Sequence, residues 1–407
     1  MLQTTPATGA SLEAYADIFG AAAVDRIRKA ASPLQGASVL HVSTSLYGTH
    51  HARMLQAAVP LLINLVLDAH WLAVRASERQ GRFANALYDA IEGEGKAWLP
   101  ELADTWRDYA FDYARAVDRH FDLVVVHDPQ LLMLRHLAKR QSSVRWIWHC
   151  HLDLRDCDQA VMRLIADEVA GYDLVAVEHP SFAGDGMRAH TVIPPAIDPL
   201  SGRNVQLPPE ITAKAFNRFD LNPEWPLVVQ VSRFDGWDDP IWAIYTYEAA
   251  RKCVPNLQLV LAATSNSAEE GFARASERSR GGHIRLLSSD LLEDFDINAL
   301  QGAAVVAMQQ GVRKGFSPAL LEASWKGRPV LAGEGGALAD QVVDGETGYI
   351  FKTFDEAAQR IAELIEDRNL ADALGFEGHR LVRENHLVMR WVEAYLNLLA
   401  PVGHGVA

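Results

Sequence analysis

Residues 314–330 read KGFSPALLEASWKGRPV, and this stretch decides the fold class. Its Gly-aromatic turn opens a short amphipathic helix with Glu322 on the second turn, and Gly-Arg-Pro-Val then begins a buried strand. The N–H groups in the first turn of a helix have no partners within the helix, so they suit an anion such as a phosphate. The stretch therefore predicts an α/β protein with an anion site at a turn-to-helix junction.

Outward from this stretch, the chain alternates apolar runs with helical segments. In the first half we expect a helix at about 51–66 and four buried strands, at 37–42, 122–127, 145–149 and 173–177. In the second half we expect four more strands, at 226–231, 257–262, 303–308 and 329–332. Near-continuous apolar runs separated by helices predict parallel strands that are covered on both faces.

A proline-rich break separates the two series. Residues 193–200 read IPPAIDPL, and proline disfavours both a helix interior and a central strand. We therefore expect two doubly wound Rossmann-like domains that face a cleft, residues 1–195 and residues 196–384. The last apolar helix, at about 388–399 within the C-terminal segment 385–407, is expected to pack back on the first domain.

Composition limits the classes of function. A chain of 407 residues fits two domains, and 49% hydrophobic with 22% charged residues is typical of a soluble globular protein. We expect no membrane span, because no run of about eighteen apolar residues occurs. The net charge of −14 argues against non-specific nucleic-acid binding. Three cysteines without metal-ligand spacing and no secretory signal favour a cytoplasmic location, and a homodimer is the default assembly.

The stretch at 314–330 resembles the donor-site segment of retaining family 4 glycosyltransferases, whose fold is called GT-B. Five segments, in the same order, look like trehalose synthases of the glycosyltransferring type, and retaining trehalose phosphorylases are similar: residues 126–130, 149–154, 193–200, 231–235 and 324–327. The resemblance implies transfer of glucose from a nucleoside diphosphate glucose to glucose or a related acceptor, with retained configuration. It also implies no cofactor and no metal ion, because basic side chains and helix N-termini hold the diphosphate in this family.

The implied donor site lies in the second domain. A departing nucleoside diphosphate gathers negative charge, which a site without metal meets with fixed cations and N–H donors. The resemblance assigns the phosphate to Arg233 and the ribose hydroxyls to Glu322. The other implied donor-binding residues are Gly48, Asp238, Lys314, Gly315, Phe316, Ser317, Gly335 and Gly336. By the residues alone, Arg233 can instead cap the sheet, Glu322 can be a solvated helix residue, and Gly335-Gly336 can be only a tight turn.

In the first domain, the resemblance implies that His151 and Asp153 end a strand and face the reacting sugar or the acceptor as catalytic residues. Asp128 and Tyr47 are expected on the acceptor side. By the residues alone, His151 can also be a hydrogen-bonded core residue. The family's triple-glycine loop is reduced here to Gly48, and the side chains that follow it would crowd a contact between backbone and diphosphate.

Two positions depart from the family pattern in charge. Asp238 stands where a phosphate-binding Lys is expected, and Lys314 replaces the first Glu of the Glu-x7-Glu pattern that ends at Glu322. In one interpretation, the two residues are an exchanged pair that keeps one cation and one anion at the donor. In the other, the donor site is lost and the protein has a binding, regulatory or scaffolding role. A carboxylate about 4 Å from a phosphate oxygen costs several kcal/mol at an effective dielectric constant of about 20. The sequence leaves both interpretations open.

Overall fold

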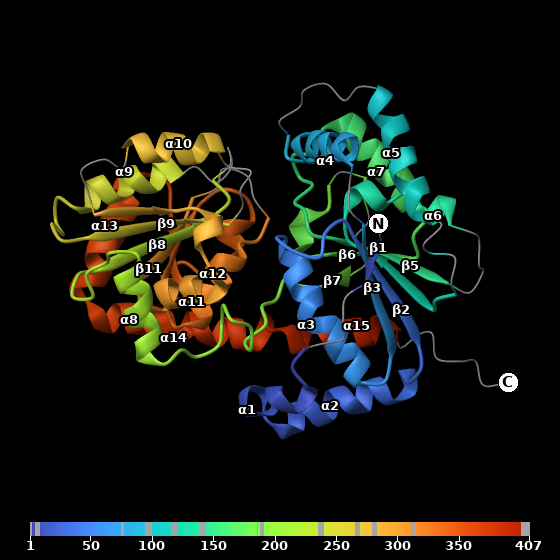
Figure 1. Ribbon diagram of the computed structural model, residues 1–407, viewed down its shortest axis with the longest axis horizontal. Coiled ribbons are helices and arrows are strands. Elements are labelled where there is room, and N and C mark those ends of the chain that lie inside the picture. Colours follow the sequence, from blue (N-terminus) through green and yellow to red (C-terminus); the bar gives the residue numbers. More distant parts are fainter. Residues whose placement is uncertain are drawn as a thin grey trace. The chain divides into compact units, whose positions relative to one another are not determined.

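The computed structural model (Figure 1) forms two compact units, Met1–Pro195 with Val388–Ala407, and Ala196–Leu387. We call them the first and the second unit and describe each by itself. The structure describes residues 2–4, 9–74, 77–93, 100–114, 117, 120–138, 144–184, 186–187, 191–234, 240–264, 269–278, 283–310 and 315–399.

The first unit is built on a seven-stranded sheet in the order β1-β3-β2-β4-β5-β6-β7. Its neighbouring strands are parallel, except that β1 runs antiparallel to β3. Parallel neighbours need crossover connections, and helices supply them here. The strands are β1 (Leu2–Thr4), β2 (Ser38–Ser43), β3 (Asp68–Val74), β4 (Leu123–Val126), β5 (Arg145–Cys150), β6 (Leu174–Val177) and β7 (Thr191–Val192).

Helices of the first unit include the last helix of the chain. Helix α3 begins at His50, and the side chain of Thr49 caps it by accepting a hydrogen bond from the Ala52 N–H. Helix α15 packs against α2 and α3 and buries Trp391 and Tyr395. The helices are α1 (Ala16–Phe19), α2 (Ala21–Ala31), α3 (His50–Asn64), α4 (Glu78–Ile91), α5 (Pro100–Ala114), α6 (Leu134–Leu137), α7 (Gln159–Val169) and α15 (Val388–Leu399).

The second unit is built on a six-stranded parallel sheet in the order β10-β9-β8-β11-β12-β13. The chain order reverses between β8 and β11, which makes the carboxyl ends of these two strands a topological switch point. The strands are β8 (Leu227–Ser232), β9 (Gln258–Ala263), β10 (Ile284–Leu287), β11 (Val306–Gln309), β12 (Val330–Gly333) and β13 (Gly348–Phe351).

Apolar side chains of β8 point to both faces of this sheet. Val228 packs in the core that contains α9 and α13, whereas Val229 packs with α8 and α11. A strand covered on both faces has a continuous apolar sequence, as β8 does. The helices are α8 (Pro209–Arg218), α9 (Pro240–Ala250), α10 (Glu269–Arg278), α11 (Asp294–Ala303), α12 (Pro318–Trp325), α13 (Phe354–Glu366) and α14 (Arg368–Asn385).

The predicted α/β class with two doubly wound sheets is confirmed. The sequence pattern missed β1, β3, β7, β10 and β13, because these strands are short, lie near a sheet edge or carry polar residues. In β3, for example, Asp68 and His70 are partly exposed and interrupt the apolar run. Among the described residues, no helix has the length and apolarity needed to cross a membrane.

Candidate functional site

Buried and half-buried polar side chains follow three neighbouring strands of the first unit, at the point where each strand ends. His127 and Asp128 follow β4, His151 follows β5, and Glu178 follows β6. Because these strands are adjacent and parallel, their carboxyl ends meet at one edge of the sheet. Doubly wound folds bind ligands at that edge. We take this group as the candidate site of the first unit.

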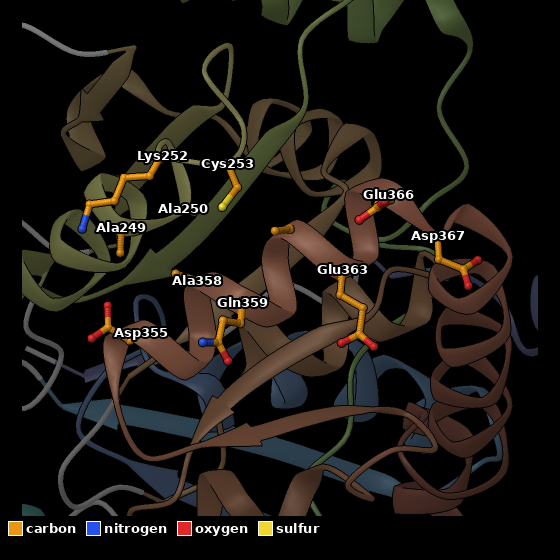
Figure 2. A pocket seen from close by; sticks show the side chains of 11 residues that line it. Ala249, Ala250, Lys252, Cys253, Asp355, Ala358, Gln359, Glu363, Glu366 and Asp367 are labelled. Carbon is orange, nitrogen blue, oxygen red and sulfur yellow. The ribbon is translucent and has the colours of Figure 1, made fainter.

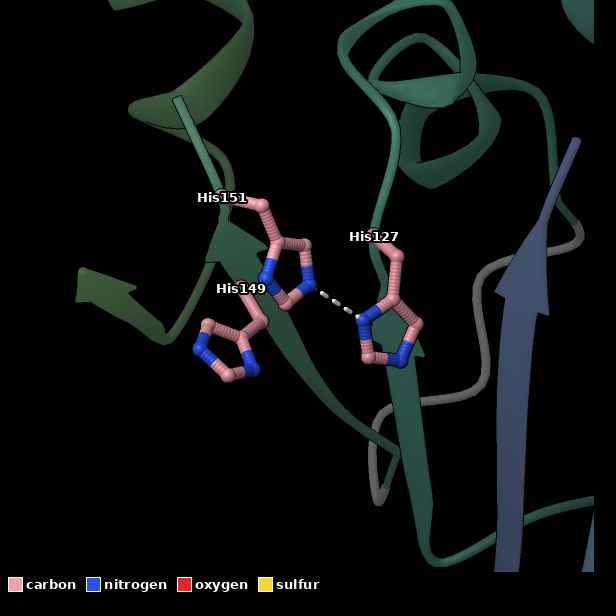
Figure 3. Close-up of side chains that lie close together, drawn as sticks. All are labelled: His127, His149 and His151. Carbon is pink, nitrogen blue, oxygen red and sulfur yellow. Dashed lines mark hydrogen bonds between the residues drawn. The ribbon is translucent and has the colours of Figure 1, made fainter. Parts of the chain in front are cut away.

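A chain of hydrogen bonds links three histidines to Glu178. His41 Nδ1 lies 3.0 Å from His127 Nε2, and His127 Nδ1 lies 2.9 Å from His151 Nε2. His151 Nδ1 lies 2.7 Å from Glu178 Oε1. Figure 3 shows the contact between His127, which follows β4, and His151, which follows β5. The chain therefore runs across β2, β4, β5 and β6.

The protonation state of Glu178 sets the direction of this chain, because a neutral imidazole has one donor and one acceptor nitrogen. When Glu178 is ionised, it accepts from His151 Nδ1, and His151 Nε2 then accepts from His127 Nδ1. His127 Nε2 in turn accepts from His41 Nδ1. When Glu178 is protonated, it can donate to His151, and every bond in the chain reverses. Burial raises the pKa of Glu178 to about 8, against a weaker lowering by His51.

Burial also keeps the histidines of the chain neutral. It lowers the pKa of His41 to about 3. Burial is the main reason that the pKa of His127 lies well below its ordinary value, and the charges of neighbouring histidines lower it further. Burial and the charge of His51 also lower the pKa of His151 well below its ordinary value, although Asp128 opposes this shift. Neutral imidazoles can donate to and accept from a sugar hydroxyl or bind a metal ion.

Asp128 is a buried carboxylate with several donors. Its Oδ2 accepts from the Thr44 N–H at 2.7 Å and lies 3.5 Å from His51 Nε2, and its Oδ1 accepts from the Tyr88 hydroxyl at 3.1 Å. Burial alone would raise the pKa of Asp128, but His51 and the Thr44 N–H outweigh burial and lower it to about 2. The His51 ring also stacks on the His151 ring, with 4.9 Å between centroids. Asp128 is therefore ionised beside the histidines.

His149 joins this group from inside β5. Its Nδ1 lies 2.6 Å from the hydroxyl of Tyr395 on α15, and its ring centroid lies 4.2 Å from that of His151. His149 is 1% exposed, and its Nε2 has no hydrogen-bond partner among the described residues. Burial, followed by the neighbouring histidines, lowers the pKa of His149, while the backbone of Ile193 opposes the shift.

The structure brings together only part of what the sequence predicted for the first unit. Asp128 and His151 both contact His51, Asp128 through its carboxylate and His151 through ring stacking. Asp153 instead pairs with Arg155, whose Nη2 lies 2.6 Å from Asp153 Oδ2. Tyr47 is 70% exposed, and Gly48 adopts φ 84°, a conformation that favours glycine. The Tyr47 backbone instead bonds the Ser45 hydroxyl, which donates to the Tyr47 carbonyl oxygen at 2.6 Å.

Sequence reasoning missed most of the group. The missed members are all buried, and they lie within or directly after a strand, at the start of α3 or on the last helix: His41, His51, His127, His149, Glu178 and Tyr395. A signal was available for His127, which is the last residue of a predicted parallel strand, and for Glu178, which directly follows one. Tyr395 gave no such signal, since only tertiary packing brings α15 to β5.

In the second unit, Arg233 follows β8 at the switch point and is exposed. The next residue, Phe234, is buried and adopts φ 58°, an uncommon conformation for a non-glycine residue. Gly335 and Gly336 follow β12, and Gly336 has φ 61° at the start of a 3-10 helix.

At the start of α12, Ser317 is bonded within the protein. Ser317 caps the helix, since its Oγ accepts from the Leu320 N–H at 3.4 Å. Its own backbone N–H donates to Gln341 Oε1 at 2.6 Å, and its hydroxyl lies 2.6 Å from Gln309 Oε1. The N–H of Ser317 is therefore used within the protein and is not open to a phosphate in this structure. Gly315 and Phe316 are partly exposed before the helix.

Glu322 is not a solvated helix residue. It is 2% exposed, and its Oε2 accepts from Arg203 Nη1 at 3.2 Å. Arg203 also donates to Asp294 Oδ1 at 2.8 Å. Burial lowers the pKa of Arg203, but the charges of Glu322 and Asp294 outweigh burial and raise it. The ribose-binding role of Glu322 stays a prediction.

Lys326, one turn after Glu322, has a buried ammonium group with three acceptors. Its Nζ lies 3.2 Å from Asn204 Oδ1, 3.0 Å from Gln301 Oε1 and 3.0 Å from the Glu322 carbonyl oxygen. Burial lowers the pKa of Lys326 to about 7, although the charge of Glu322 opposes the shift. Arg203, Glu322 and Lys326 thus form a second polar cluster, which we call the charged cluster.

Two predicted residues, Asp238 and Lys314, lie outside the described residues. A surface hollow of about 590 Å³ lies between α9 and α13 (Figure 2), and it contains none of the predicted residues. Its lining includes Lys252, Asp355, Glu363 and Glu366. An acidic hollow of this kind gives no indication of the chemistry of a ligand.

Comparison with known proteins places these observations in a family. Residues 41–184 match the model of the trehalose synthase N-terminal domain, and residues 212–380 match that of the group 1 glycosyl transferases. A trehalose synthase of Rubrobacter xylanophilus is 30% identical over 414 residues, which cover 99% of this chain and 99% of the relative. A trehalose synthase of Pyrococcus horikoshii is 29% identical over 402 residues, 96% of each chain.

Solved structures agree on the fold. An α,α-trehalose 6-phosphate synthase from Burkholderia multivorans superposes with a TM-score of 0.68 at 14% identity, covering 91% of this chain and 100% of that chain. A sucrose-phosphate synthase from Thermosynechococcus elongatus gives a TM-score of 0.65 at 15% identity, covering 90% and 100%. The fold is GT-B, and the chain belongs to the trehalose synthase family of glycosyltransferases.

Proposed function

We propose that the protein is a retaining glucosyltransferase, which moves glucose from a nucleoside diphosphate glucose to glucose or a related acceptor. One observation carries the proposal. The matched trehalose synthase domain, residues 41–184, contains the buried Glu178 and Asp128 and the half-buried His151, which follow neighbouring strands of the first sheet. A group of hydrogen-bonding residues at that edge suits a sugar, because each hydroxyl needs both donors and acceptors.

In the proposed reaction, the bond between the anomeric carbon of glucose and the diphosphate oxygen breaks. The acceptor hydroxyl forms the new bond on the same face, and its proton leaves with the nucleoside diphosphate. Arg233 meets the charge that develops on the diphosphate, without a metal ion at the phosphates. His151, held by Glu178 at 2.7 Å, exchanges its bond with His127 for a hydrogen bond to a sugar hydroxyl, and the ionised Asp128 accepts from the acceptor.

A second candidate is a non-catalytic role in binding, regulation or scaffolding. Asp238 and Lys314 favour it, because both reverse the charge that the family pattern places at the donor. The use of the Ser317 N–H within the protein also removes one donor from the anion cradle. Under this proposal the protein retains sugar affinity but has lost the affinity for a nucleoside diphosphate.

A single set of four proteins separates the candidates: wild type, Asp238→Lys, Lys314→Glu and the double variant. Glucosyl transfer and donor affinity are measured with a panel of nucleoside diphosphate glucoses and glucose. Turnover by the wild type supports the transferase, with Asp238 and Lys314 as a working exchange. A silent wild type and a double variant that gains donor binding support the non-catalytic role. Strictly additive effects show that the two side chains do not share a site.

A further inference from the structure

We propose that Arg203 is a positioning residue for the Glu322 carboxylate, and that it thereby sets the preference of the donor site for ribonucleotides over deoxyribonucleotides. The inference rests on the proposed function, in which the donor is a nucleoside diphosphate glucose. The family resemblance assigns the ribose hydroxyls to Glu322 and gives no role to Arg203. Arg203 lies just after the proline-rich break, 119 residues before Glu322, and the fold joins the two side chains.

The two oxygens of the Glu322 carboxylate have different surroundings. The side chain is 3% exposed, and its Oε2 accepts from Arg203 Nη1 at 3.2 Å. Among the residues that the structure describes, none donates to Oε1, and the nearby Lys326 ammonium bonds the Glu322 carbonyl oxygen instead of the carboxylate. A carboxylate can accept about four hydrogen bonds, and buried polar atoms normally have partners. Oε1 is therefore the oxygen left for a hydroxyl of a ligand.

A second carboxylate fixes the guanidinium of Arg203. Its Nε donates to Asp294 Oδ1 at 2.8 Å, while its Nη1 donates to Glu322. Asp294 begins α11 and Glu322 lies on α12, so one planar group joins two helices. The donors of a guanidinium point in fixed directions, whereas a lysine ammonium is a compact charge on a flexible stem. The orientation of the Glu322 carboxylate is therefore tied to the positions of both helices.

The backbone on either side of Arg203 is held by the same two helices. Asn298 Nδ2 on α11 donates at 2.9 Å to the carbonyl oxygen of Gly202, directly before Arg203. Trp325 Nε1 on α12 donates at 3.1 Å to the carbonyl oxygen of Asn204, directly after it. Arg203 therefore cannot swing away from its carboxylate partners without breaking hydrogen bonds to both helices.

This arrangement favours a ribose because the carboxylate is oriented before the ligand arrives. A glutamate side chain has three rotatable bonds, and ordering them on binding would lower the affinity. Here folding already orders them through Arg203. A sugar that lacks the hydroxyl facing Oε1 leaves a charged acceptor desolvated and without a partner, which is unfavourable. We expect the wild type to bind a ribonucleoside diphosphate at least about 10-fold more tightly than its deoxy form.

The test measures binding to the full chain by calorimetry, with ADP, GDP and UDP, each beside its 2′-deoxy and 3′-deoxy forms. The readout is the ratio of the deoxy to the ribo dissociation constant, because a merely structural role of Arg203 would change both constants together. Arg203→Lys keeps the charge beside Glu322 but loses the fixed directions, so the ratio should fall to about 3-fold or less. Asp294→Asn weakens only the second anchor of Arg203, at a side chain that is 58% exposed, and should lower the ratio part of the way.

The matched control is Arg218→Lys, which alters an arginine that pairs with a different acid of α11, Asp296, at 2.6 Å. Its ratio should equal that of the wild type. An unchanged ratio in a folded Arg203→Lys overturns the inference, and if that variant does not fold by circular dichroism, Asp294→Asn decides in its place. A wild type that binds nucleoside diphosphates without preferring the ribo forms overturns this inference alone. A wild type that binds none of them overturns the proposed function as well.

Discussion

The two units have related folds but bury polar side chains of different kinds. In the first unit, the buried group at the sheet edge consists largely of histidines that burial keeps neutral, joined to Glu178 and Asp128. In the second unit, the charged cluster joins the guanidinium of Arg203 to the carboxylate of Glu322, with Lys326 nearby. The same doubly wound framework thus supports a nearly neutral network and an ionic one.

This difference indicates which network is suited to ligand binding and which one matters for the stability of the fold. A neutral histidine chain costs little to bury and can reverse its hydrogen bonds, which suits sugar hydroxyls. A buried ion pair costs more to desolvate and becomes strongly destabilising when one partner is lost. We therefore expect substitutions that remove a charge from the charged cluster to affect mainly stability, and substitutions in the histidine group to affect mainly ligands.

The largest expected effect comes from Arg203→Met. This change leaves the Glu322 carboxylate buried without its cation, so the free energy of unfolding should fall by about 3–5 kcal/mol. In the first unit, His41→Leu removes a neutral partner and should cost about 1–3 kcal/mol. Urea denaturation measures both. The control Arg380→Met, which removes exposed ion pairs to Glu377 and Glu384, should leave stability nearly unchanged. Equal losses for Arg203→Met and His41→Leu would remove the contrast between the two units.

The second largest expected effect is a pH dependence of the free energy of unfolding, which arises from Lys326. The folded protein releases the Lys326 proton at a pKa of about 7, whereas the ordinary value is 10.5. Between these values the unfolded chain binds more protons, so stability rises with pH across this window and levels off outside it. The difference in unfolding free energy between wild type and Lys326→Met should change by a few kcal/mol from pH 7 to 10, on the order set by the shift. A difference that stays constant with pH would mean that Lys326 keeps its charge in the fold.

Arg233→Ala tests the donor side of the proposed function. Loss of a charge-assisted contact should weaken nucleoside diphosphate binding by about 1.5–3 kcal/mol and leave glucose and trehalose binding nearly unchanged. Isothermal titration calorimetry measures the three affinities. Arg274→Ala on α10 is a suitable control, because it removes an arginine of the same unit that the site does not include. Unchanged diphosphate affinity in Arg233→Ala would take Arg233 out of the donor site.

The smallest effect is expected at the start of α12. Ser317→Ala removes the helix cap and the hydroxyl contact with Gln309, so stability should fall by about 1 kcal/mol. The Ser317 N–H keeps its bond to Gln341, so diphosphate binding should not improve. Gln341→Leu frees that N–H, and a gain in diphosphate affinity there would show that the predicted anion cradle is merely occupied. Thermal unfolding and calorimetry separate the two results.

Local patterns were enough to predict eight apolar strands, because a strand buried on both faces carries its signal in its own residues. They were not enough for β3 or β10, where polar side chains at partly exposed positions break the run. In the same way, the family motifs pointed to His151 and Asp128, which follow strands. They also pointed to Asp153, which accepts hydrogen bonds from the nearby Arg155.

By itself, the sequence determined the fold class, the two series of strands and the family, since periodicity and motifs are local properties of the chain. Only the tertiary structure decided which residues share a site. His41, His127, His149 and Glu178 come from four strands or strand ends, and Tyr395 lies 246 residues from its partner His149. Their contacts depend on strand order and on the packing of α15, and both are set by interactions between residues that are far apart in the sequence. The buried partners of Glu322 and Lys326 likewise follow from packing and not from spacing.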